Sequence, residues 1–109
     1  MITSIINTAV SGLQAAEKRL ANSANNVANV QSENFTPQRI TQTSTNPGVR
    51  SDVIDVDPAR IPTPEGDAPN VDLASEVIEQ QLSTYDFKAN LKVLETADEM
   101  AEDILDMMA

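Results

Sequence analysis

The sequence predicts a mainly α protein in which two long terminal helices pair as an antiparallel α-helical coiled coil. Both ends repeat apolar or small residues at helical spacing, and residues 72–108 contain neither glycine nor proline. All six prolines lie between residues 37 and 69, so the middle of the chain cannot extend either helix. We therefore divide the chain into an N-terminal helix in residues 1–35, a proline-rich connector with at most a small β-hairpin in 36–71, and a C-terminal helix in 72–109.

The N-terminal helix is predicted to begin at Thr3 or Ser4, either of which can cap it, and to fade near Val30. From Ile2, apolar and small residues recur in alternating steps of four and three, which is the spacing of a coiled-coil seam. The residues of this helix that we expect to contact the second helix are Ile6, Leu13, Leu20 and Val27. A thin strip of small residues either lets another helix approach closely or reflects simple tolerance of a glycine: Ala9, Gly12 and Ala16.

Four asparagines crowd the end of this helix: Asn22, Asn25, Asn26 and Asn29. Asparagine is a poor helix former because its amide competes for backbone hydrogen bonds. Either the helix end frays there with exposed amides, or the amides pair across a subunit contact, where an unpaired polar group is costly. We predict that these four side chains make lateral contacts between subunits.

The connector has two short segments with β character, residues 38–44 and 49–56, separated by the turn residues Asn46, Pro47 and Gly48. This pattern predicts a hairpin whose turn lies near Asn46–Gly48. Residues 58–69 contain four of the six prolines, so we expect irregular or extended chain there.

The C-terminal helix is predicted to begin after Asn70 or at Asp72, whose carboxylate can cap it and favour the positive end of its dipole. If it continues to Met108 it is roughly 55 Å long, at about 1.5 Å per residue. Its apolar face is wide and drifts around the helix, which is typical of a helix with more than one neighbour. The residues expected to pair with the first helix are Leu82, Leu91, Leu94 and Leu105.

Composition argues against several functional classes. The chain has no cysteine and no histidine, which removes thiolate chemistry, disulfides and the commonest general base and metal ligand. We therefore predict no catalytic residue, no cofactor and no metal, and the acidic residues Asp52, Asp55 and Asp57 lack the spacing of a calcium-binding loop. The net charge of −10 disfavours nucleic acid. No membrane insertion and no cleavable secretion signal are expected.

Two motifs resemble the terminal signatures of bacterial flagellar rod and hook proteins. The first comprises Ser11-Gly12-Leu13-Gln14-Ala15-Ala16, then Ala24-Asn25-Asn26-Val27-Ala28-Asn29, and then Asn34-Phe35. The second comprises residues 70–76, Tyr85, Ala89-Asn90, Lys92-Val93 and residues 96–100. The short middle of the chain is most similar to the small proximal-rod type. The sequence departs from the family pattern at Ala24, where serine is usual, and at Phe35, which follows Asn34 rather than glycine.

The resemblance implies a structural subunit of the flagellar basal-body rod, which polymerises through its terminal helices into a helical axial tube. Such a tube transmits torque and encloses the export channel. The implied partners are copies of the chain itself, other rod and hook axial proteins, and the flagellar type III export apparatus. The implied location is the basal body, spanning the periplasm after export.

Composition alone supports a different hypothesis, a soluble acidic coiled-coil adaptor or export chaperone. Residues 72–109 contain ten acidic residues against Lys88 and Lys92, so this helix could bind a basic partner. An adaptor of this kind is expected to be a folded helical protein that never polymerises. The rod hypothesis instead expects poorly ordered ends in the free subunit.

Overall fold

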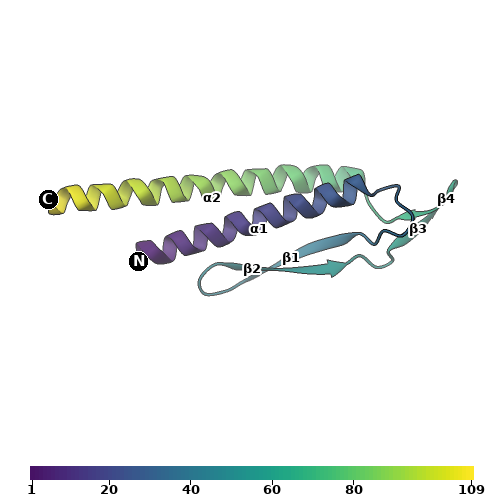
Figure 1. The fold of residues 1–109 in the computed structure, drawn as a ribbon, viewed down its shortest axis with the longest axis horizontal. Helices are drawn as coiled ribbons and strands as arrows, with labels where there is room; N and C mark the ends of the chain where they lie inside the picture. Colours follow the sequence, from purple (N-terminus) through teal and green to yellow (C-terminus); the bar gives the residue numbers. More distant parts are fainter.

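A computed structural model describes all residues, 1–109. The elements follow in the order α1 (Ile2–Ala28), β1 (Gln38–Ser44), β2 (Val49–Asp55), β3 (Arg60–Thr63), β4 (Gly66–Pro69) and α2 (Leu73–Met108). The molecule is elongated, with extents of 70 × 22 × 16 Å, and the two helices run antiparallel along its long axis (Figure 1). The helices contain 27 and 36 residues, so the predicted mainly α character is confirmed.

The two helices start in different ways. Asp72 caps α2, because its Oδ1 accepts hydrogen bonds from the backbone N–H groups of Ala74 at 3.1 Å and Ser75 at 3.4 Å. The predicted cap of this helix is therefore confirmed. The predicted cap of α1 is wrong, since the helix already begins at Ile2, one residue before Thr3, without a side-chain cap. Its other end lies at Ala28, close to the expected end.

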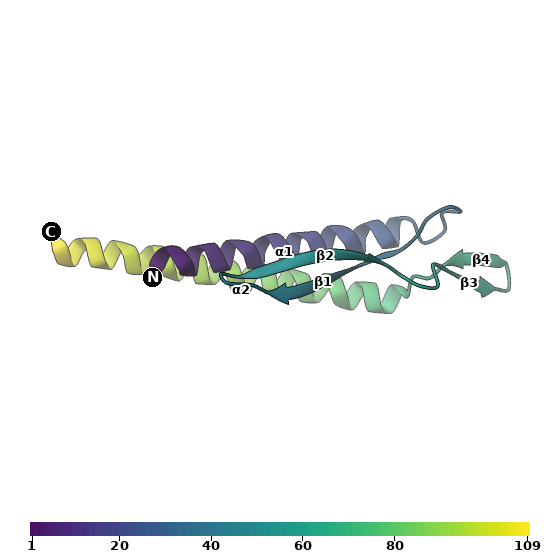
Figure 2. The same cartoon turned by 90° about the horizontal axis from the view of Figure 1, so that it is seen from below.

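The connector forms two separate two-stranded sheets. Strands β1 and β2 pair antiparallel from Gln38 opposite Asp55 to Ser44 opposite Val49, which confirms the predicted hairpin and its turn. Strands β3 and β4 form a second hairpin that lies beyond the ends of the helices (Figure 2). The expectation of irregular chain in residues 58–69 and of at most one hairpin is therefore wrong. In a two-stranded ribbon every strand has a free edge, so a proline without an N–H can be accommodated.

Helix α1 lies between the other large elements, with α2 along one side and the β1–β2 hairpin along the other (Figure 1). No Cα atom of β1 or β2 lies within 8 Å of one in α2. Apart from Pro37 and Pro69 in the connector, the buried apolar residues are all alanines: Ala9, Ala15, Ala16 and Ala97. Two serines, Ser23 and Ser83, are buried with them. The elements therefore meet through small side chains and a close backbone approach.

Gly12 lies at this close approach. A Cβ atom added to Gly12 would lie 2.6 Å from Oδ1 of Asn90 on α2, which is far inside van der Waals contact. The side chain of Asn90 fills the space that a larger residue on α1 would need. Of the two readings of the small-residue strip, the structure favours close helix approach.

We expected large apolar side chains to form the buried contact between α1 and α2, and within one chain this expectation is wrong. Leu13, Val27 and Leu94 are only half-buried. The remaining residues of the predicted pairing are between 37 and 66% exposed: Ile6, Leu20, Leu82, Leu91 and Leu105. Small residues occupy most of the fully buried positions of the two helices, so the leucines lie toward the edges of the contact rather than at its centre. Their contacts with other chains stay a prediction.

The tip of the β1–β2 hairpin depends on Gly48. This residue has φ of +92°, and a Cβ atom there would collide with the hydroxyl of Ser11 and lie 2.9 Å from its Cβ. We expect Gly48→Ala to lower the free energy of unfolding by about 2 kcal/mol through strain and collision together. Chemical denaturation followed by circular dichroism measures the change.

Gly66 provides the matched control, because its φ is +117° but the space around it is open. Gly66→Ala is expected to cost about 1 kcal/mol, from backbone strain alone. Equal losses for the two variants would contradict a tight contact between the hairpin tip and α1.

Candidate functional site

The last turns of α1 join β1 and α2 through a set of polar groups that we call the amide junction, formed by Asn22, Ser23, Asn26, Gln38 and Glu76. Nδ2 of Asn22 donates to the backbone carbonyl of Gln38 at 2.7 Å. Oγ of Ser23, which is fully buried, donates to the backbone carbonyl of Glu76 at 3.0 Å. One helix face thus holds the start of a strand and the start of the second helix.

Asn26 is the centre of the amide junction and only 2% exposed. Its Nδ2 donates to the carbonyl of Gln38 at 2.8 Å, and its Oδ1 accepts from the backbone N–H of Gln38 at 3.2 Å. The second Nδ2 hydrogen bond reaches Oε1 of Glu76 at 3.1 Å. Both donors and the acceptor of the amide are therefore used inside the chain, as a buried amide requires.

The predicted lateral subunit contact is consequently wrong for Asn26, which is buried and fully engaged inside its own chain. Asn22 is half-buried and also bonds within the chain. Asn29 ends α1 and donates from Nδ2 to the carbonyl of Asn25 at 2.9 Å, so the helix ends in an ordered cap. Lateral contacts of Asn25, which is exposed, and of Asn29 stay a prediction.

Arg19 connects the two helices next to the amide junction, and sequence reasoning did not identify it. Its Nε donates to Oε1 of Glu79 at 2.6 Å and its Nη1 to Oδ2 of Asp86 at 2.7 Å. The Arg19 side chain is 14% exposed, so these contacts are partly shielded from water. The available signal was its spacing of seven residues from both Gly12 and Asn26, which places all three on one helix face.

The hydrogen bond to Glu79 raises the pKa of Arg19 above its ordinary value; burial opposes this rise and the hydrogen bond to Asp86 adds to it. A cation whose pKa is raised by folding stabilises the folded state at every pH below its unfolded pKa. That contribution disappears only as the pH rises through the folded pKa. The ion pairs therefore hold the helices together across the whole neutral range.

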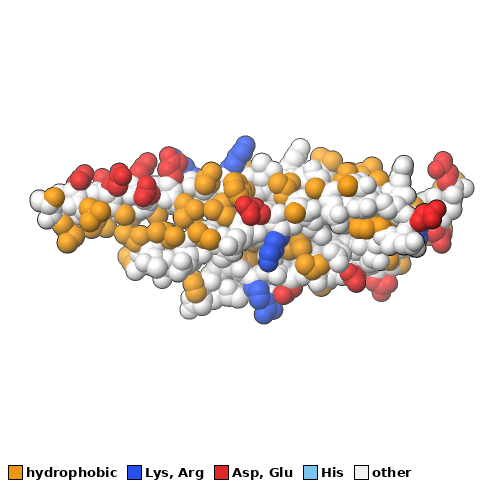
Figure 3. All heavy atoms as spheres, in the orientation of Figure 1, with side chains coloured by type: hydrophobic (Ala, Val, Ile, Leu, Met, Phe, Trp, Pro, Cys, Tyr) orange, Lys and Arg blue, Asp and Glu red, His pale blue; other side chains and the backbone are white.

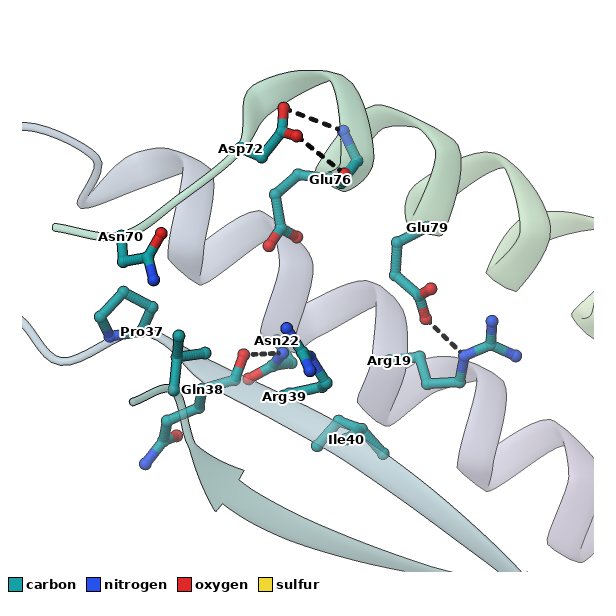
Figure 4. A pocket seen from close by; sticks show the side chains of 12 residues that line it. Arg19, Asn22, Pro37, Gln38, Arg39, Ile40, Asn70, Asp72, Glu76 and Glu79 are labelled. Carbon is teal, nitrogen blue, oxygen red and sulfur yellow. Dashed lines mark hydrogen bonds and ion pairs between the residues drawn. The ribbon is translucent and has the colours of Figure 1, made fainter. Parts of the chain in front are cut away.

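A cavity of about 420 Å³ opens beside the amide junction. Asp72, the N-cap of α2, lines it together with Glu76 and Glu79 of α2, while Gln38, Arg39 and Ile40 line it from β1 (Figure 4). Arg19 and Asn22 contribute from α1 (Figure 4). The ionisable groups in this lining are carboxylates and guanidinium groups, and the chain has no group of three or more acidic side chains placed to hold a metal ion. The expected absence of catalysis stays a prediction.

Large apolar side chains lie along both helices outside the contact between them (Figure 3). A shallow groove between α1 and α2 is lined by Leu20, Val77 and Tyr85 together with polar residues. A second groove is lined by Ile5, Val93 and Met100 among others. Neither helix is both long enough and apolar enough to cross a membrane. These exposed residues form a surface suited to protein–protein contact.

Neither the models of known protein families nor the curated proteins contain a match to this chain. The geometry of the helix pair and its surface is therefore the basis for assigning a function.

Proposed function

We propose that the chain is a structural subunit of the bacterial flagellar basal-body rod. In this proposal α1 and α2 act as one antiparallel coiled-coil unit, and copies of the unit polymerise into a helical axial tube that transmits torque and encloses the export channel. The partners are copies of the chain, other rod and hook axial proteins, and the flagellar type III export apparatus. The location is the basal body, across the periplasm after export.

The observation that supports this proposal best is the distribution of apolar residues. The alanine core of the chain is small, whereas leucines, valines and isoleucines along both helices remain substantially exposed. Full burial of one such side chain contributes about 1.5–3 kcal/mol, so repeated contacts with neighbours would stabilise an assembly strongly. Contacts that pair different surfaces of successive copies generate a helical polymer wherever the rotation between copies does not close a ring. The elongated helix pair is a suitable unit for such a polymer.

Mass spectrometry of purified hook–basal bodies from the native host tests the proposal directly. Quantification against a known rod subunit is expected to give comparable, stoichiometric abundance. Absence from the basal body, with abundant protein in the soluble fraction, would contradict the structural role.

A surface substitution tests the assembly contact separately from folding. Leu91 is 50% exposed, so Leu91→Asp is expected to leave the fold of the single chain intact while removing incorporation into basal bodies. The reason is that a buried, unpaired carboxylate at a subunit contact is strongly unfavourable. Circular dichroism of the purified variant and its abundance in isolated basal bodies are the two measurements.

Val53→Asp is the matched control, since Val53 is 56% exposed and lies on β2 rather than on a helix. It introduces the same charge and is expected to be incorporated normally. Normal incorporation of Leu91→Asp would exclude this part of α2 from the assembly contact.

The acidic adaptor or export chaperone remains the second candidate, and the end of α2 favours it. Asp98, Glu99 and Glu102 form no ion pair within the chain, so this surface is available to a basic partner. The adaptor hypothesis expects a monomer that stays helical and unpolymerised at micromolar concentration in the cytoplasm. Analytical ultracentrifugation with cell fractionation distinguishes it from the rod subunit.

A further inference from the structure

Asn26 is the only side chain that is hydrogen-bonded both to the β1–β2 hairpin and to α2. The neighbouring members of the amide junction each reach one element: Asn22 bonds to β1, and Ser23 bonds to α2. The hairpin strands and α2 are otherwise separated, with no Cα atoms within 8 Å of each other. Asn26 is therefore the one side chain through which hydrogen bonds connect these two elements.

The hairpin has little else to hold it on α1. None of its strand residues is fully buried, and the only fully buried residue next to the strands is Pro37, directly before β1. Its polar attachments are the amide junction at Gln38 and, near the turn, the hydroxyl of Ser11, which accepts from the backbone N–H of Val49 at 3.1 Å. Loss of one attachment should therefore measurably lower the fraction of molecules in which the β1–β2 hairpin is docked on α1.

The hydrogen bond between Asn26 and Glu76 affects how the same amide binds Gln38. Glu76 accepts one Nδ2 hydrogen and so fixes the orientation of the Asn26 side chain, with Oδ1 and the other Nδ2 hydrogen directed at Gln38. A charged acceptor on the nitrogen also polarises the amide, which strengthens Oδ1 as an acceptor. When Glu76 is absent, the side chain must lose rotamer freedom before it can bind the strand.

We propose that Asn26 couples docking of the β1–β2 hairpin on α1 to docking of α2, so that the hairpin is held firmly only when the helices are paired. The coupling is reciprocal, because each element makes the other's contact with Asn26 more favourable. The device operates inside a single chain and does not depend on the proposed role in the rod. A failure of either proposal therefore leaves the other unaffected.

Amide hydrogen exchange of the full chain, measured by NMR, tests the coupling. The backbone N–H of Gln38 reports on one attachment of the hairpin and that of Val49 reports on the other. Glu76→Ala removes the acceptor on α2 without touching either reporter. We expect both amides to exchange about tenfold faster in this variant than in the wild-type chain.

Two further variants make the test specific. Glu79→Ala also removes a contact between α2 and α1, its ion pair with Arg19, but Glu79 forms no hydrogen bond with Asn26. It is expected to accelerate the two reporters much less than Glu76→Ala. Glu76→Gln keeps a side-chain oxygen that can accept from Nδ2, so exchange at both reporters is expected to return to near wild-type rates.

Equal acceleration in Glu76→Ala and Glu79→Ala would overturn the proposal, because the effect would then reflect general loosening of the helix pair. No acceleration in Glu76→Ala would overturn it as well. Acceleration at Gln38 without acceleration at Val49 would indicate local fraying rather than undocking of the hairpin, and it too would overturn the coupling.

Discussion

Replacing Asn26 with aspartate is expected to lower the free energy of unfolding by about 3 kcal/mol, the largest effect of any isosteric substitution in the chain. The change keeps the size of the side chain but removes both N–H donors, which bind the Gln38 carbonyl and Glu76. It also places a carboxylate in a site that is 2% exposed, next to the carboxylate of Glu76. Urea denaturation of the purified chain, followed by circular dichroism, gives the difference.

Asn25 supplies the control for this substitution. It occupies the same turn of α1 and is exposed, so Asn25→Asp adds the same charge without breaking a buried contact. Its expected cost is below about 0.5 kcal/mol, as for other surface changes. If the two variants unfold at the same urea concentration, the amide junction does not stabilise the fold.

Gly12→Leu is expected to lower the free energy of unfolding by about 3 kcal/mol, because an overpacked helix contact forces side chains and backbone to shift. Even a Cβ atom at this position would lie 2.6 Å from Asn90 Oδ1 and 2.7 Å from its Cγ. The Asn90 side chain is itself held, since its Nδ2 donates to the carbonyl of Asp86 at 2.9 Å. Thermal unfolding measured by circular dichroism gives the loss.

A compensating substitution identifies the cause. Asn90→Ala removes the atoms that the new Cβ would meet, so the double variant Gly12→Ala/Asn90→Ala should be more stable than Gly12→Ala alone. Alanine in place of glycine also favours the helix by about 1 kcal/mol. If Asn90→Ala does not rescue the Gly12→Ala variant, close approach at Gly12 is not the source of its destabilisation.

The elements of the fold that local chemistry specifies were predictable from the sequence. Residues 72–108 lack glycine and proline, and Asp72 is a strong cap. The predicted bounds of α2 are therefore close to the observed ones. The turn around Gly48 followed from residues that favour turns. The β3–β4 hairpin was missed because its prolines suppress the usual strand signal, although a two-stranded ribbon can accommodate them.

The contact between the helices was harder to predict because two faces of α1 satisfy the same periodicity. The leucine face of α1, which includes Leu13 and Leu20, has the stronger hydrophobic signal. The structure instead turns Gly12, Arg19 and Asn26 toward α2 and the hairpin, where close approach, ion pairs and amide hydrogen bonds replace apolar burial. Hydrophobic spacing cannot detect such a contact because none of these three residues is a large apolar one.

The partner of the asparagine face was also ambiguous in the sequence. Their spacing correctly suggested an amide face, but sequence alone could not show whether its partner was another chain or the residues near Gln38. For Asn26 the partner is the chain's own backbone.

Both hairpins lie between α1 and α2 in the sequence, which has a consequence for the order of folding. The two partners of the Ser23–Glu76 bond are 53 positions apart, and those of the Arg19–Asp86 pair are 67 apart, so helix pairing requires closure of a long loop. Each hairpin brings the ends of its own segment together, which shortens the effective loop at the amide junction. We therefore expect the helices to zip from the amide junction toward the two chain termini, whose turns pair last and open first.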